Sequence, residues 1–241
     1  SVQLAGNDIQ LTPDTPFLAR TKGAITFSER GFAIAGAQAR ALGGDVKIDG
    51  GTRPAAPRSQ DSIVAIRAQG TATAEGLRQA KELGFVTRLA KDASGSAAYN
   101  VNVMFRRGQP EVLVTSTLQG LAVNLPAPMA KSADTQLPLR YENALTRESL
   151  AQPAGEGRPL QDHLTFDLGR VVSTVFLRDV SGPEARVLRG AIGVGLAPGE
   201  SATLPDQGVT ANINLANVNL DQWEELFGQS ASAGARGAAP Q

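Results

Sequence analysis

Few side chains in this sequence combine the types and the spacing that catalysis requires. Asp162 and His163 are adjacent and could contribute to a hydrolytic triad, but no G-x-S-x-G segment supplies a nucleophilic serine. His163 is the only histidine and cysteine is absent, so thiolate chemistry is excluded and a histidine-based metal site is disfavoured. A structural role is the favoured interpretation of His163, and a hydrolase built on these two residues is the weakest of three functional hypotheses.

Two other clusters of polar or small residues also favour structural interpretations. Asp45, Asp49 and Asp61 resemble a loose calcium cluster, but their spacing fits no EF-hand loop, and the first two alternate along one expected strand. The glycine-rich stretch 190–195 lacks the Lys-Ser/Thr that completes a phosphate-binding loop. The sequence therefore predicts no catalytic residues, no metal and no cofactor, and we expect the protein not to be an enzyme.

The charge and composition of the chain narrow the classes of partner. The 241 residues include 23 Lys and Arg and 23 Asp and Glu, so the formal net charge is zero. A nucleic-acid binder would carry a basic footprint, and docking on anionic lipid headgroups would also need excess positive charge. No apolar run reaches the roughly 20 residues of a membrane span, and no signal peptide is visible. We expect no nucleic-acid partner and read the chain as an internal piece of a longer protein.

The elements that would have to position any functional group are mainly strands. In residues 23–50, apolar side chains occupy every second position on both sides of a turn at 28–31, and again after a turn at 43–44. Such alternation places apolar side chains on one face of a sheet and polar ones on the other. The pattern returns along most of the chain. It predicts an elongated, strongly curved antiparallel meander sheet, either an open groove or a flattened sandwich.

The hydrophobic period changes to helical spacing between residues 73 and 92. We expect two short amphipathic helices there, near 74–92, with Thr73 as the first cap and a break at Gly84. They could plug an apolar groove or simply cover the end of the sheet. Another short helix is expected near 220–227. Residues 1–228 then form a single β-rich segment, and 229–241 form a disordered, low-complexity tail.

The alternation also selects a set of residues that could line an apolar groove. They are large or β-branched side chains at matching positions of successive expected strands. The set is Ile25, Phe27, Phe32, Ile34, Val46, Ile48, Val101, Val103, Val112, Val114, Phe166, Ile192, Val194, Ile213 and Leu215. Each could equally be a core residue under a facing sheet or helix, because alternation does not show what covers a face.

Several stretches resemble the AsmA-like family, and more specifically its YhdP branch. They are the meander GAITFSERGFAIAGAQARALGGDVKIDGG at 23–51, GTATAEGLRQ at 70–79, the stretch 114–141, LRGAIGVG at 188–195 and GVTANINLANVNLDQW at 208–223. The stretch 114–141, which contains LPAPMAK, is the most specific of them. Together these stretches span most of the chain, and their order strengthens the resemblance.

The resemblance implies a location and a function. The proteins that this chain resembles are anchored in the inner membrane of Gram-negative bacteria and have a long, β-rich periplasmic part with an apolar groove. They are implicated in carrying phospholipid between the inner and outer membranes, and the family offers no catalytic residues. The resemblance therefore implies a periplasmic segment whose partners are phospholipid acyl chains and the remaining segments of the same long chain. Membrane contact would occur through regions outside this chain.

Two main hypotheses follow. In the first, the chain is a non-enzymatic segment that shields acyl chains in an apolar β groove. In the alternative, it is a structural or interaction module with a sealed core, serving as a spacer or as a platform for envelope assembly. An open apolar surface favours the first hypothesis and a sealed core favours the second.

Overall fold

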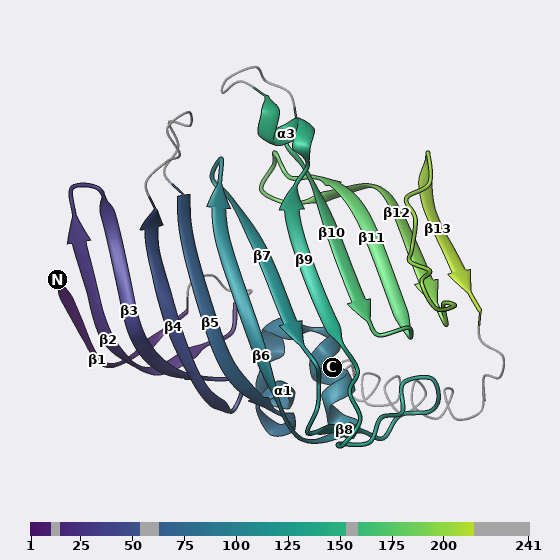
Figure 1. Ribbon diagram of the computed structural model, residues 1–241, viewed down its shortest axis with the longest axis horizontal. Coiled ribbons are helices and arrows are strands. Elements are labelled where there is room, and N and C mark those ends of the chain that lie inside the picture. Colours follow the sequence, from purple (N-terminus) through teal and green to yellow (C-terminus); the bar gives the residue numbers. More distant parts are fainter. Residues whose placement is uncertain (11–14, 54–62, 153–158, 215–241) are drawn as a thin grey trace, which may run out of the picture.

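The computed structural model describes residues 1–10, 15–53, 63–152 and 159–214, and most of them belong to one β-sheet (Figure 1). The strands are β1 (Val2–Ile9), β2 (Leu18–Ser28), β3 (Gly31–Ala41), β4 (Gly44–Arg53), β5 (Ile63–Thr73), β6 (Ala93–Arg106), β7 (Gln109–Ser116), β8 (Leu121–Val123), β9 (Leu139–Leu145), β10 (Gln161–Leu168), β11 (Val172–Asp179), β12 (Arg186–Val194) and β13 (Gly208–Ile213). The helices are α1 (Ala74–Gln79), α2 (Phe85–Leu89) and α3 (Arg147–Ala151), with 3-10 turns at Lys81–Leu83 and Ala90–Asp92. The helix expected near 220–227 and the tail 229–241 lie outside the described residues.

The order of the strands in the sheet follows the chain. Strands β1 to β7 and β9 to β12 pair with their neighbours in antiparallel fashion, and β8 pairs with the first residues of β6. The sheet does not close, because β1 and β13 are its two outer strands. No second sheet packs on either face within the described ranges. The predicted curved meander is confirmed, and of the two expected shapes the open sheet is present.

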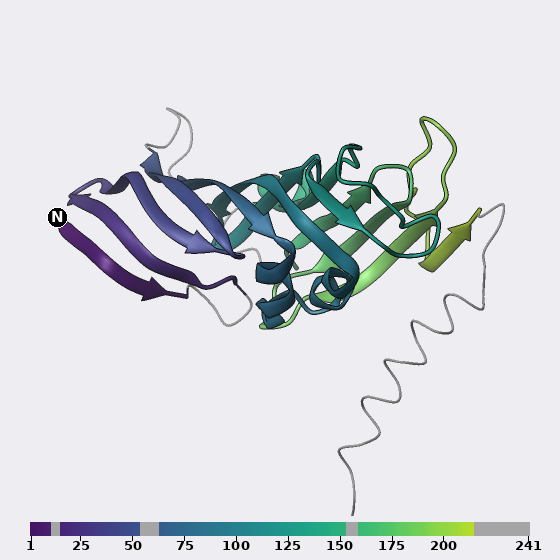
Figure 2. The same cartoon turned by 90° about the horizontal axis from the view of Figure 1, so that it is seen from below.

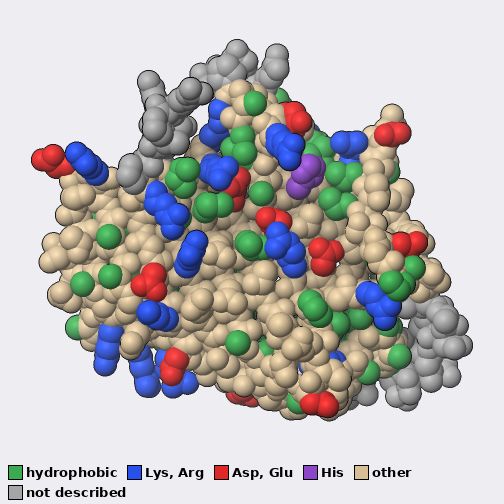
Figure 3. Space-filling view, in the orientation of Figure 1, with side chains coloured by type: hydrophobic (Ala, Val, Ile, Leu, Met, Phe, Trp, Pro, Cys, Tyr) green, Lys and Arg blue, Asp and Glu red, His purple; other side chains and the backbone are tan. Residues whose placement is uncertain are grey.

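The strand register divides the sheet into an apolar face and a polar face. Residues directly opposite each other on paired strands point to the same side of a sheet. Val103 lies opposite both Ile66 and Val112, and we call the side that carries these residues and their in-register neighbours the apolar face. The polar face carries charged side chains such as Lys47 and Arg140. Figure 3 shows Lys, Arg, Asp and Glu side chains scattered over one side of the molecule.

Glycine bulges bend the first strands. The register shifts between Ile34 and Ala37 on β3, where Gly36 has φ 59°, and again next to Gly23 on β2, where φ is 144°. An extra residue in one strand of a pair increases its bend and twist, and glycine adopts these positive φ values without steric strain. Figure 2 shows that the sheet is bowed and twisted rather than flat.

The last strand differs from the antiparallel expectation. β13 pairs with β12 in parallel, from Arg189 opposite Gly208 to Val194 opposite Ile213. A parallel partner requires a long crossover connection, and residues 195–207 supply it. The backbone N–H of Ala202 donates to Ser173 Oγ on the polar face at 3.2 Å, so the crossover runs over that side and leaves the apolar face of β11 and β12 uncovered by it.

The helical segment between β5 and β6 was predicted correctly. Thr73 caps α1, accepting a hydrogen bond from the Gly76 N–H at 3.0 Å, and Gly84, with φ 53°, separates the two short helices. Ala74 packs in one buried cluster with Ala97, which lies on the apolar face. The segment therefore covers the apolar face only at one end of β5 and β6, the lower end in Figure 1.

The close contact of α1 with the β3–β4 turn provides a stability prediction. A Cβ added at Gly76 would lie 2.0 Å from both the carbonyl carbon and the oxygen of Leu42. We expect Gly76→Ala to lower the free energy of unfolding by about 1–3 kcal/mol, because the turn and helix must move apart. Urea unfolding would measure this loss, and Gly182→Ala is the matched control, since its nearest neighbour would be 3.8 Å away. Equal stability of both variants would contradict the prediction.

Small residues make the densest part of the core. Ala37, Ala39, Ala41, Val46 and Ile48, all on the apolar face of β3 and β4, form one buried cluster. The side chains that pack against it come from β2, β3, β5 and β6 of the same sheet. Among the described residues, the cluster is therefore buried by neighbours in the same bowed sheet and not by a second sheet.

Candidate functional site

The apolar face is continuous from β2 to β13, and it is the candidate functional site. Every predicted lining residue that the structure describes lies on it, because each is linked to the next by cross-strand pairing. These residues are Ile25, Phe27, Phe32, Ile34, Val46, Ile48, Val101, Val103, Val112, Val114, Phe166, Ile192, Val194 and Ile213. Leu215 lies outside the described residues.

Exposure varies across this set. Val46 and Ile48 are only 4% and 8% exposed and belong to the buried cluster. Phe27 and Ile213, near opposite ends of the sheet, are 58% and 65% exposed. The other members, from β2 to β12, are half-buried by their in-plane neighbours. Most of the described apolar face is therefore exposed enough to contact another apolar surface, either of a protein or of a lipid.

Charge is nearly absent from the apolar face. Along the described register from β2 to β13, the only charged residues on this side are Asp162 and Arg178, which lie opposite each other on β10 and β11. Arg178 donates from Nε to Asp162 Oδ1 at 3.0 Å and from Nη2 to Oδ2 at 2.6 Å. The pair is deeply placed, with 3% of the Asp162 side chain and 18% of the Arg178 side chain exposed. The pair lies in the row beside the loop 180–185, so the other rows of the described face carry no charged residue.

This geometry removes the basis for a hydrolytic dyad. Asp162 binds Arg178, whereas His163, the next residue along β10, points to the opposite face and is exposed. Sequence reasoning missed Arg178. A signal was present, since Arg178 stands two positions after Phe176 in the apolar register of its strand, as Asp162 stands two before Leu164.

The pKa values of two tyrosines reflect the low polarity of the apolar face. Burial raises the pKa of the Tyr99 hydroxyl, and it also raises the pKa of Tyr141, where the charge of Arg178 opposes the shift and that of Asp162 adds to it. Both side chains lie on the apolar face, opposite Ser116 and Val114 respectively. A hydroxyl is harder to ionise where water is partly excluded.

The acidic residues considered as calcium ligands lie on the polar face. Asp45 and Asp49 are exposed and approach Arg40 at 3.9 Å and Lys47 at 3.8 Å. Asp61 lies outside the described residues. Nowhere in the described part of the chain do three or more potential metal-ligating side chains gather. Asp45 and Asp49 are therefore exposed side chains on the polar face of the strand.

The stretch 114–141 has a structural role at the end of β6. Lys131 is 8% exposed, and its Nζ donates to the carbonyl oxygens of Leu121 and Ser132, each at 2.8 Å. Burial lowers the pKa of this amine, while the Asp134 charge acts in the opposite direction. Leu121 is buried together with Ala97. Through these two hydrogen bonds, Lys131 holds the loop that follows β7 against β8 at the end of the sheet.

A search of curated proteins and a search of solved structures each returned no significant match. Within the ranges that the structure describes, no helix is long and apolar enough to cross a membrane. The family model described as YhdP protein matches residues 1–241, the whole chain. The chain therefore belongs to the YhdP family, a non-enzymatic, lipid-transport-related family of the cell envelope.

Proposed function

We propose that this chain shields phospholipid acyl chains on its apolar face while the lipid moves between the inner and outer membranes. The observation that carries the proposal is the apolar register from β2 to β13, which is largely half-buried, is uncharged apart from the Asp162–Arg178 pair, and has no covering sheet in the described residues. The chain would act in the periplasm as part of a protein anchored in the inner membrane. It would shield lipid without catalysis.

The physical basis is the transfer of acyl chains from water. Each buried CH₂ group contributes about 0.8 kcal/mol, so a long chain gains many kcal/mol on an apolar surface. The acyl chains of one leaflet span about 15 Å, half of the hydrocarbon core of a bilayer. β6, with 14 residues, is about 45 Å long at about 3.3 Å per residue. The face is thus large enough to hold whole acyl chains while headgroups stay in water.

The outer strands support a proposal about partners. Each of β1 and β13 pairs on one side only within the described sheet. Open strand edges readily pair with another strand. We propose that the remaining segments of the same long chain extend the sheet at these edges and that membrane contact occurs through those other segments.

The proposal predicts that lipid accompanies the purified chain and depends on Phe27. Native mass spectrometry with lipid extraction, on protein purified gently from bacterial cells, should detect copurifying phospholipid. Phe27→Asp should reduce the bound lipid about tenfold, because acyl carbons would have to contact a charged carboxylate. The fold should survive, since the Phe27 side chain is 58% exposed.

The neighbouring residue supplies the matched control. Thr26 is exposed and lies on the polar face, opposite Ala33, so Thr26→Asp should leave the lipid content unchanged. A lipid-free wild-type mass, with no binding of added fluorescent phospholipid, would instead support the spacer or assembly platform with a sealed core. Unfolding of Phe27→Asp would assign Phe27 to the core.

A further inference from the structure

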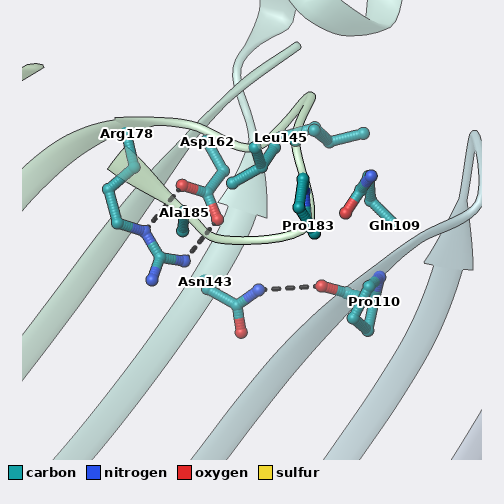
Figure 4. A pocket seen from close by; sticks show the side chains of 10 residues that line it. Gln109, Pro110, Asn143, Leu145, Asp162, Arg178, Pro183 and Ala185 are labelled. Carbon is teal, nitrogen blue, oxygen red and sulfur yellow. Dashed lines mark hydrogen bonds and ion pairs between the residues drawn. The ribbon is translucent and has the colours of Figure 1, made fainter. Parts of the chain in front are cut away.

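A polar pocket lies where the apolar face ends, at the top of β9, β10 and β11 (Figure 4). Its floor is the cross-strand row of Leu145, Asp162 and Arg178, and the loop 180–185 forms one wall. The next row of the sheet, Asn143 and Leu164, continues directly into the apolar face. Its volume of about 190 Å³ is too small for a whole lipid. The pocket borders the apolar face, however, and that face could hold the acyl chains of the same lipid.

The pocket contains hydrogen-bond donors that the fold itself does not use. Arg178 engages Asp162 through Nε and Nη2, and its Nη1 has no hydrogen-bond partner among the described residues. Asn143 Nδ2 donates one N–H to the Pro110 carbonyl oxygen at 2.8 Å, which leaves its second N–H available. Arg178 and Asn143 both line the pocket, and Figure 4 shows the Asn143 amide below the ion pair of Arg178 and Asp162. Unused N–H donors that line one pocket can bind an oxyanion.

We propose that this pocket binds the phosphodiester group of a phospholipid through Arg178 Nη1 and Asn143 Nδ2, with the acyl chains on the adjacent apolar face. The inference rests on the proposed function and adds a headgroup contact to it. Guanidinium groups form strong hydrogen bonds with phosphate oxygens. Because Asp162 already neutralises Arg178, the contact holds the headgroup weakly, which suits a lipid that must leave again.

The test compares two ligands that share acyl chains and differ in the phosphate. The intact 241-residue chain is titrated with a fluorescent phosphatidylethanolamine and with the diacylglycerol that carries the same acyl chains. We expect the wild type to bind the phospholipid about tenfold more tightly, the effect of one or two hydrogen bonds to a charged group. This comparison needs no variant and so does not depend on how a mutant folds.

The matched variant is Asp162→Asn combined with Arg178→Gln. Changing both residues avoids leaving one buried charge unpaired, which would itself destabilise the fold. The double variant should lose most of the preference for the phospholipid, because the guanidinium is gone and only Asn143 of the two proposed donors remains. An undiminished preference in the double variant, or equal loss of both ligands in a folded variant, would overturn the headgroup assignment.

The remaining outcomes separate this inference from the proposed function. Equal affinity of the wild type for both ligands would overturn the headgroup site and leave the acyl-chain face intact. Binding of neither ligand would overturn the proposed function and the inference with it. Glycerophosphoethanolamine, the headgroup without acyl chains, should not compete at the same concentration. Competition as strong as that of the phospholipid would make this a site for a soluble phosphodiester instead.

Discussion

Val103→Glu combined with Val112→Lys should abolish lipid binding while the sheet stays folded. These two residues lie directly opposite each other on β6 and β7, at the centre of the apolar face. An acyl chain that crosses the face there would have to strip water from two charges, and burying a charged group costs several kcal/mol even when it is paired. Copurified lipid should therefore fall at least tenfold, measured by lipid extraction and native mass spectrometry.

The fold should tolerate this change for a specific reason. Opposite charges on directly facing strand residues stabilise the pair by about 0.2–1 kcal/mol, which offsets part of the lost apolar contact. The matched control is Asn102→Glu with Leu113→Lys, a cross-strand pair of the same two strands that points to the polar face. It should retain its lipid. Loss of lipid in both double variants would contradict an apolar-face binding site, and so would retention in both.

The two faces of the sheet could be predicted from sequence because strand geometry has a period of two. Once Ile25, Phe32 and Val46 alternate with small or polar residues, short turns leave little freedom in how the strands pair. The register then brings predicted residues as distant as Val101 and Val114 directly opposite each other. The expected helices could be found for a similar reason, since Thr73 and Gly84 mark a start and a break that depend only on local backbone chemistry.

Other features depend on contacts that no local pattern carries. The direction of β13 is set by the crossover 195–207 and by its contact with Ser173, a residue of β11 that lies far from β13 in the sequence. The partner of Asp162 is Arg178, which only the β10–β11 register brings within reach. Alternation also predicted both Val46 and Phe27 as groove-lining residues, although Val46 is 4% exposed and Phe27 is 58% exposed. That difference arises from the curvature of the sheet, which several strands determine together.

Because of this difference in exposure, a substitution can test experimentally which residues belong to the core and which to the open groove. Val46→Asp should unfold the protein, because it would bury a carboxylate without a partner among Ala37, Ala39 and Ile48. A buried, unpaired charge destabilises by about 3–5 kcal/mol, a large fraction of the roughly 5–15 kcal/mol that stabilises a typical domain. Circular dichroism and urea unfolding would measure the loss.

The pH dependence of this variant gives a second, independent readout. Burial raises the pKa of an introduced carboxyl above its value in the unfolded chain, so the destabilisation is complete at neutral pH and is relieved as the pH falls and the folded form takes up a proton. Gln69→Asp is the control, because Gln69 is exposed on the polar face opposite Lys47, and it should stay near wild-type stability. If Val46→Asp instead remained folded and lost only lipid, Val46 would belong to the open face, and the part of the sheet available to acyl chains would extend over β3 and β4.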